Sequence, residues 1–297
     1  MERIILIETS TALCSVALCE QGHIISYKES DAMKAHASLT AAFVDGILKE
    51  KGLTLKDCDA VCVSMGPGSY TGLRVGVSTA KGLCFGAGLP LLAVGTLDTL
   101  VAQAFARETL ECSKNDGAKV MMPVGDFLHI VPMIDARRME VYTGVFSKIA
   151  PGQGSGQDLG RDLQEKQGVG EYQIAGSFPD AEGCRDAEGC QDANERRLTK
   201  GPNFIQTTET APHIVTPESF QEHLAEGPVL FIGDGAGKCT DVIKNENAFF
   251  LQCCPQASSM AAPATDAFLK KEFRDVAYFE PFYLKEFTAT VSKKKLF

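Results

Sequence analysis

The sequence predicts an α/β protein in two lobes, each with a mixed β-sheet flanked by helices. Three observations lead to this prediction. The first hundred residues read as three strands followed by alternating helices and strands, an order typical of a sheet with helices on its faces. A similar order of elements begins again near residue 130. The chain has 297 residues, which is long enough for two lobes that each bury a core.

The first lobe is expected over residues 1–110. Short apolar runs separated by turns predict its opening strands, which span 4–8, 15–19 and 24–27. Apolar residues then recur at the helical spacing over 36–51, so this segment is predicted to be an amphipathic helix. A strand at 91–94 and a helix capped by Thr96 complete the lobe.

The most informative segment of the first lobe is a strand, a tight turn and a glycine-rich helix. The strand is predicted at 60–64, the turn at 66–68 and the helix at 71–86, with Ser69 or Thr71 as its N-cap. Along that helix small residues recur every fourth position, namely Gly72, Gly76, Ala80 and Cys84. Such a row lets another helix approach closely, and we interpret it as an assembly surface. The alternative is that the row packs on the chain's own sheet.

The second lobe is expected over residues 111–297. A hairpin at 130–135 and 140–146, and a strand at 229–232 with a following helix, repeat the arrangement of the first lobe. Between them, about 151–212, the chain is rich in Gly, Gln, Asp and Glu and carries two copies of a hexapeptide. This composition offers little apolar surface, so a low-complexity, disordered insertion is predicted there.

Composition restricts the compartment and the partners. Eleven cysteines without a C-x-x-C pair indicate reduced thiols, and Cys19, Cys62 and Cys84 lie among apolar residues as expected for core positions. No apolar run is long enough for a membrane span, so we expect a cytoplasmic protein. The net charge of −9 disfavours independent RNA binding. The one basic cluster is Lys293–Lys295, which is typical of a solvated terminus.

Four motifs, in the same order along the chain, resemble the TsaB (YeaZ) family, which is related to the TsaD/Kae1 proteins. They are the sequences IETS at 7–10, GPGSYTGLR at 66–74, IDARRMEVY at 134–142 and EPFYLK at 280–285. The resemblance covers residues 1 to about 146 and about 227–297. It implies a two-lobed actin-like ATPase (ASKHA) fold.

The resemblance also implies a function. The chain would be a non-catalytic dimerisation subunit in the synthesis of N6-threonylcarbamoyladenosine (t6A) at position 37 of tRNA. It would pair with TsaD, be joined by the ATPase TsaE, form a homodimer when alone, and meet tRNA only through the complex. The pairing surface would be the helices 36–51 and 71–86. The residues expected there are Leu39, Phe43, Ile47, Gly72, Leu73, Gly76, Val77 and Ala80.

An enzyme of this family would need a metal site and a nucleotide-binding site of its own. TsaD-type enzymes bind a metal through H-x-x-x-H on a helix, but here Thr40 stands four residues after His36, so no metal site is expected. Two hairpin turns could be remnants of a nucleotide site, although neither contains the glycine that phosphate cradles favour. The possible vestigial contacts are Glu8, Thr9, Ser10, Asp135, Gly233 and Gly235.

Several alternatives stay open on the residues alone. The turn around Gly233 and Gly235 is more typical of a plain strand–helix connection than of a nucleotide contact. The glycines at 66, 68 and 72 have a spacing that does not match a dinucleotide loop. No catalytic residue and no cofactor of the chain's own is expected, although ATP or ADP could lie at an interface within the complex. The competing functions are a stand-alone actin-like ATPase, a glycoprotease-like hydrolase and an independent tRNA-binding module.

Overall fold

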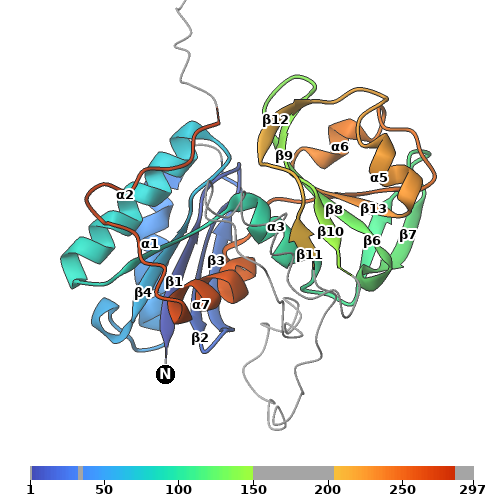
Figure 1. Ribbon diagram of the computed structural model, residues 1–297. Coiled ribbons are helices and arrows are strands. Elements are labelled where there is room, and N and C mark those ends of the chain that lie inside the picture. Colours follow the sequence, from blue (N-terminus) through green and yellow to red (C-terminus); the bar gives the residue numbers. More distant parts are fainter. Residues whose placement is uncertain (1, 33–35, 150–203, 285–297) are drawn as a thin grey trace, which may run out of the picture.

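The computed structural model describes residues 2–32, 36–149 and 204–284. Two sheets form two lobes side by side, each with helices on its faces (Figure 1). The predicted fold class is therefore confirmed. Most of the predicted insertion and the tail with Lys293–Lys295 lie outside the described residues.

The first sheet has five strands in the order β3-β2-β1-β4-β5. β1 (Arg3–Glu8) pairs antiparallel with β2 (Cys14–Glu20), which pairs antiparallel with β3 (His23–Ser30). On its other side β1 runs parallel to β4 (Ala60–Ser64), and β4 runs parallel to β5 (Leu91–Val94). The three parallel strands are almost wholly buried, because both faces of this sheet are covered.

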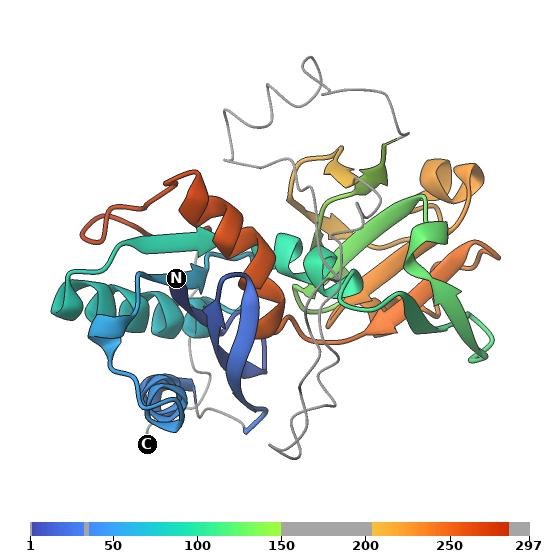
Figure 2. The same ribbon diagram turned by 90° about the horizontal axis from the view of Figure 1, so that it is seen from below.

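Alternate side chains of the first sheet serve two different cores, as the period of two in a strand requires. Ile5, Ile7 and Val63 face α1 (His36–Glu50) and α2 (Tyr70–Ala87). Ile4, Leu6 and Cys62 face the 3-10 turn η4 (Ala257–Met260) and α7 (Ala261–Leu269). The helices α1 and α2 thus cover one face, and η4 with α7 covers the other (Figure 2).

The boundaries of α2 follow from its capping residues. The Ser69 hydroxyl accepts a hydrogen bond from the Gly72 amide at 3.3 Å, which makes Ser69 the N-cap. Gly88 ends the helix with a φ of 72°, in the left-handed region that glycine adopts at little cost. The prediction of 71–86 was therefore right to within one residue at each end.

The second sheet has nine strands, with the path β11-β10-β8-β13-β14-β6-β7 and with β9 and β12 beside it. Its strands are β6 (Thr109–Ser113), β7 (Lys119–Pro123), β8 (His129–Asp135), β9 (Glu140–Thr143), β10 (Phe146–Lys148), β11 (Phe204–Gln206), β12 (Ala211–Ile214), β13 (Val229–Gly233) and β14 (Ala248–Gln252). The short helices α5 (Gln221–Glu226) and α6 (Ala236–Cys239) pack on one face.

The second sheet repeats the first, as predicted. β8 pairs antiparallel with β9 and runs parallel to β13, which runs parallel to β14. This is the order of β2, β1, β4 and β5. In each lobe, the helix that follows the last parallel strand packs on the sheet of the other lobe. α3 (Thr96–Ala104) follows β5 but packs on the second sheet, whereas α7 follows β14 but packs on the first.

The structure corrects three predicted ranges. The range 111–297 for the second lobe is wrong at its end, because residues 257–284 pack on the first lobe. The range 1–110 for the first lobe wrongly includes α3. The predicted insertion of about 151–212 is also too long, because β11 pairs with β10 and β12 pairs with β9. Phe204 is buried in the core that covers α3.

The predicted core cysteines and the possibility of a membrane-spanning helix can both be checked in the structure. Cys19, Cys62 and Cys84 are buried, as predicted for core cysteines. Among the described residues, none of the helices has both the length and the apolar character needed to span a membrane.

Candidate functional site: the outer face of α2 and two hairpin turns

The row of small residues on α2 faces the chain's own sheet, so its interpretation as an assembly surface is wrong. A methyl group at Gly72 would overlap the carbonyl oxygen of Thr9, and one at Gly76 would overlap the Thr9 hydroxyl. The Thr9 hydroxyl donates to the Gly72 carbonyl at 2.9 Å. These glycines therefore allow α2 to approach the turn between β1 and β2.

Other residues expected at the partner interface are also buried in the first lobe. Leu73, Val77, Ala80 and Ile47 are each at most 4% exposed, and the last three contribute to the core under α1 and α2. The predicted placement of these side chains against a partner is therefore corrected, since a partner could not reach them. Leu39 and Phe43 on α1 are partly exposed. Their role in pairing stays a prediction.

The exposed face of α2 carries a different set of residues. Arg74, Ser78, Gly82, Phe85 and Gly86 are all exposed. Phe85 is 86% exposed, which is unusual for a large apolar side chain. A Cβ at position 82 or 86 would meet no atom within 4 Å. This face combines little side-chain bulk with one open aromatic ring, and the prediction of 71–86 as the pairing helix now rests on it.

The last described segment, residues 270–284, runs along α2 and is hydrogen-bonded to it. The Lys81 ammonium donates to the carbonyls of Ala277 and Phe279 at 2.9 and 3.0 Å. Farther along, the Phe282 amide donates to the Met65 carbonyl at 2.7 Å. The Tyr283 ring then lies 4.8 Å from the Tyr70 ring, centroid to centroid.

Two hollows border α2. One, of about 430 Å³, lies near the start of the helix and is lined by residues that include Ala37, Tyr70 and Arg74. The other, of about 540 Å³, lies near its end between Phe85 and residues 275–277.

The turn after β1 contains three of the predicted vestigial contacts. Glu8, Thr9 and Ser10 are at most 1% exposed. The Glu8 carboxylate accepts hydrogen bonds from the Ser10 amide at 2.6 Å and the Ser64 hydroxyl at 2.9 Å. Its second oxygen, Oε2, has no partner among the described residues. Burial raises the pKa of Glu8 to about 7. These three side chains are thus covered by other parts of the chain.

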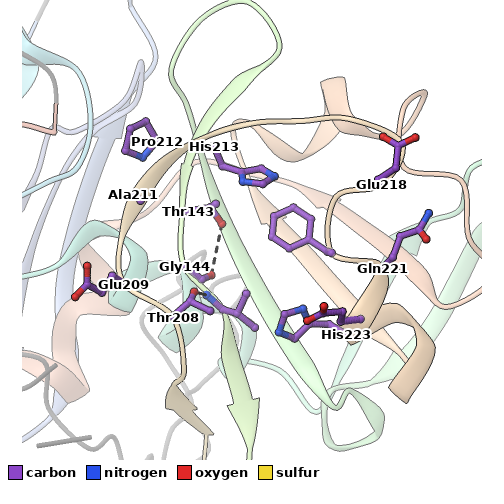
Figure 3. Close-up of a pocket in the computed structure, with 13 residues that line it drawn as sticks. Thr143, Gly144, Thr208, Glu209, Ala211, Pro212, His213, Glu218, Gln221 and His223 are labelled. Carbon is purple, nitrogen blue, oxygen red and sulfur yellow. Dashed lines mark hydrogen bonds between the residues drawn. The ribbon is translucent and has the colours of Figure 1, made fainter. Parts of the chain in front are cut away.

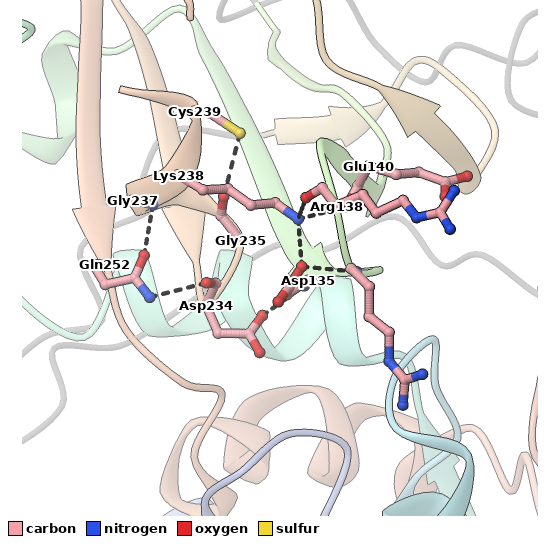
Figure 4. A network of polar contacts seen from close by, with 10 residues as sticks. Asp135, Arg138, Glu140, Asp234, Gly235, Gly237, Lys238, Cys239 and Gln252 are labelled. Atoms are coloured by element: carbon pink, nitrogen blue, oxygen red, sulfur yellow. Dashed lines mark hydrogen bonds and ion pairs between the residues drawn. The ribbon is translucent and has the colours of Figure 1, made fainter. Parts of the chain in front are cut away.

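The turn after β8 contains Asp135 and is exposed (Figure 4). The Asp135 carboxylate accepts from the Arg137 amide at 2.9 Å and pairs with the Lys238 ammonium. The Asp135 amide donates to the Asp234 carboxylate at 2.9 Å. Burial raises the pKa of Asp234 to about 6. The Gly235 amide donates to Met133 at 3.0 Å, so Gly235 belongs to a strand–helix connection.

Close packing in the second lobe also explains why position 233 is a glycine. Its φ is 132°, and a Cβ there would overlap the Met133 carbonyl. The six predicted nucleotide contacts thus form two separate groups, one in each lobe. Binding of a nucleotide to either group stays a prediction.

His36 and Thr40 occupy the two positions at which TsaD-type enzymes would carry metal-binding histidines. The His36 imidazole contacts the Thr11 carbonyl at 3.0 Å through Nε2. Thr40, at the position of the missing second ligand, is buried and donates to the His36 carbonyl at 2.7 Å. Within the described residues no group of three His, Cys, Asp or Glu side chains is arranged to hold a metal ion.

A further pocket in the second lobe was not predicted (Figure 3). It has a volume of about 480 Å³ and lies between the end of β9, β12 and α5. His213 and His223 point into it, and its rim carries Glu209 and Glu218. Burial lowers the pKa of His213, so this imidazole is neutral at pH 7. No sequence pattern indicated this pocket, because its walls come from three separate segments of the chain, at 143–145, 208–213 and 218–223.

Comparison with known proteins bears on the family. The family model for TsaD, tRNA N6-adenosine threonylcarbamoyltransferase, matches residues 29–154, which include α1 and α2. The tRNA threonylcarbamoyladenosine biosynthesis protein TsaB of Haemophilus influenzae is 36% identical over 136 residues, which are 46% of this chain and 50% of that protein. TsaB of Escherichia coli is 34% identical over 146 residues, 49% of this chain and 55% of that protein. The chain thus spans about half the length of the curated relatives it matches.

A solved structure extends the likeness in fold. A crystal structure from Pseudomonas aeruginosa, described as a protein with similarity to peptidase YeaZ, superposes with a TM-score of 0.65. The superposition covers 96% of this chain and all of that one, at 21% sequence identity. At this identity the likeness concerns the fold alone.

Proposed function

Since the predicted resemblance to TsaB (YeaZ) is confirmed, we propose that this chain is a subunit of the machinery that synthesises t6A in tRNA. In this proposal it is a non-catalytic scaffold that pairs with TsaD, with TsaE joining the pair. Transfer of the threonylcarbamoyl group then takes place on TsaD. The observation that carries the proposal is the sequence likeness to TsaB, a protein named for this biosynthesis.

The exposed sides of α1 and α2 are the proposed pairing surface. Helix-to-helix contact needs backbones that come close, and the open positions Gly82 and Gly86 on α2 permit this. The exposed Phe85 side chain supplies apolar surface, and burying this surface against a partner would favour pairing. The same face would support a homodimer in the absence of TsaD. A cytoplasmic location also stays a prediction.

The corrected orientation of α2 changes the decisive substitution. Gly76→Leu would disturb the folded lobe, because the new side chain would collide with Thr9. Gly82→Leu places the same side chain in open space and should leave the melting temperature unchanged or slightly raised. We expect Gly82→Leu to abolish co-elution with TsaD in size-exclusion chromatography. Gly125→Leu, also in open space but in the second lobe, is the matched control and should co-elute normally.

The enzyme alternative is tested with the same material. tRNA modification is reconstituted from purified components, TsaD and TsaE among them, with and without this chain. The proposal predicts that modification depends on the chain and that Gly82→Leu cannot replace it. Normal co-elution of the Gly82→Leu variant would refute the surface. Modification that proceeds fully without the chain would refute the function.

A further inference from the structure

Two arginines stand on the tip of the hairpin between β8 and β9 in an unfavourable backbone conformation. Arg137 has a φ of 69° and Arg138 a φ of 52°. Both values lie in the left-handed region, which residues with a Cβ seldom occupy and which glycine or asparagine fills more easily. Long cationic side chains are thus kept at two successive positions that favour small residues. Such outliers persist only where the surroundings fix them, and they gather at functional sites.

The surroundings fix this turn through a polar network (Figure 4). The Lys238 ammonium donates to the carbonyl of Arg138 at 2.9 Å and to that of Glu140 at 2.7 Å, and it pairs with Asp135. Behind it, the Gln252 side chain donates to the Asp234 carbonyl at 2.9 Å. The turn also closes on itself, because the Ala136 amide donates to Glu140 at 3.1 Å. The network therefore holds a rigid base under the two arginines.

Inside the network the one ammonium group, that of Lys238, pairs with Asp135, and the Asp234 carboxylate accepts a hydrogen bond from the Asp135 amide. Lys238 neutralises Asp135 and uses its hydrogen-bond donors within the base. Both arginines are exposed. Among the described residues, neither guanidinium group has a hydrogen bond or an ion pair. The turn therefore presents two exposed positive charges above the carboxylates of Asp135, Asp234 and Glu140, on a chain whose net charge is −9.

We propose that the Arg137–Arg138 turn binds phosphate groups of an RNA backbone. The planar guanidinium group matches two phosphate oxygens at once and stays charged at every physiological pH. Both groups project from an exposed turn, whereas a free nucleotide is ordinarily held in a concave pocket. An extended polyanion that passes over the surface fits this geometry better. The proposal rests on the proposed function, which supplies tRNA as the RNA.

The acidic remainder of the chain sets the strength of this contact. Two phosphate contacts give little affinity by themselves, and the net charge opposes the approach of RNA. The turn is therefore a positioning contact, which becomes effective when the chain is assembled with a partner that binds the same RNA. This agrees with the prediction that tRNA meets the chain only through the complex.

The test measures binding of unmodified tRNA to the chain assembled with TsaD, by fluorescence anisotropy at several salt concentrations. The key variant carries Arg137→Asn and Arg138→Gly, which removes both charges and suits the left-handed backbone. We expect about tenfold weaker binding, and a slope of log K against log salt that is shallower by about 2. The melting temperature should stay equal or rise, which excludes unfolding as the cause.

A matched control removes two positive charges elsewhere in the second lobe. Lys119→Gln with Lys244→Gln has the same net charge as the key variant, and both lysines are exposed. This control should bind tRNA with the wild-type slope. Equal slopes for the wild type and the key variant would overturn the proposal. A loss of ATP binding with unchanged tRNA binding would overturn it too, because the ligand would then be a nucleotide.

The outcome is kept separate from that of the proposed function. The same titration is made with the chain alone at about 50 mM salt, where phosphate contacts are strongest. If the chain fails to assemble with TsaD but its weak tRNA binding still depends on the two arginines, the turn is an RNA contact and the scaffold function is wrong. If assembly is normal and the slope does not change, the scaffold function stands and the RNA contact is wrong.

Discussion

The turn after β1 and the turn after β8 occupy the same place in the two repeats, yet their surroundings are opposite. In the first lobe, Glu8 is buried and has no ion pair within the part of the chain that the structure describes, and α2 packs directly on the turn through Gly72. In the second lobe, Asp135 is exposed, paired with Lys238, and followed by two unpaired arginines. Only a short four-residue helix, α6, follows β13 there.

The difference shows how one repeated unit can acquire two separate roles. The first turn has become part of a packed core, and its burial lets α2 lie close and present its other face outward. The second turn has stayed at the surface with a polar base. The three predictions below test this contrast.

The largest effect is expected from adding one methyl group under each turn. Gly72→Ala should destabilise the chain by about 3 kcal/mol, because the methyl group meets the backbone of Thr9, which cannot yield. Gly235→Ala should cost about 1 kcal/mol, since a Cβ there would meet the side-chain carbon Cγ1 of Val141 at 2.9 Å and backbone atoms of Met133 and Asp135 only at 3.2 and 3.3 Å. Urea unfolding at pH 7 measures both. Equal costs for the two substitutions would contradict the proposed difference in packing.

A smaller effect is expected from the charge of Glu8. Its pKa is raised from about 4.5 to about 7 in the folded chain. A raised carboxyl pKa stabilises the fold below the unfolded value, and this stability is lost as pH rises through about 7. Glu8→Gln keeps an acceptor for Ser10 and Ser64 and cannot ionise. At pH 8 it should therefore exceed the wild type in stability by about 2 kcal/mol.

The control for Glu8 is the pH dependence itself. Between pH 5 and pH 8 the urea midpoint of the wild type should fall, and that of Glu8→Gln should fall less. Asp234, with its pKa raised to about 6, contributes a dependence of the same sign in both proteins. A Glu8→Gln variant that is less stable than the wild type at pH 8 would show that the buried carboxylate is stabilised by a partner.

The smallest effect is expected from the counter-charge of the second turn. Lys238→Met keeps the apolar stem and removes the ammonium group that holds Asp135 and two carbonyls. Because the pair is partly exposed, the cost should be only about 1 kcal/mol. Amide exchange at residues 136–140 should increase more than elsewhere. Lys270→Met, which breaks the surface pair with Asp266, is the control, with a cost below about 0.5 kcal/mol.

The sequence was sufficient to predict the fold class and most elements of the first lobe. Apolar runs and glycine signals placed β1, β4 and α2 to within a residue or two, since these features act locally. The repeat was also predictable, because the hairpin after residue 130 copies the first in arrangement. These elements depend on short-range pattern and on burial of both sheet faces.

The orientation of α2 could not be read from the same pattern. A row of small residues is compatible with a partner helix or with the chain's own backbone, and only the approach of Thr9 to Gly72 and Gly76 decides between them. The arginine turn was missed for a related reason. Its positive φ values and the reach of Lys238 across 100 residues to Arg138 are properties of the folded chain.

The return of α7 and residues 270–284 to the first sheet has a consequence for biosynthesis. A ribosome makes the strands of that sheet early, but the layer that shields Ile4 and Leu6 is added only after about 250 further residues have been translated. During synthesis, one apolar face of the first sheet therefore stays exposed until α7 has been translated. The second lobe can fold before that point. Chaperone demand during synthesis should thus concentrate on the half of the molecule that emerges first.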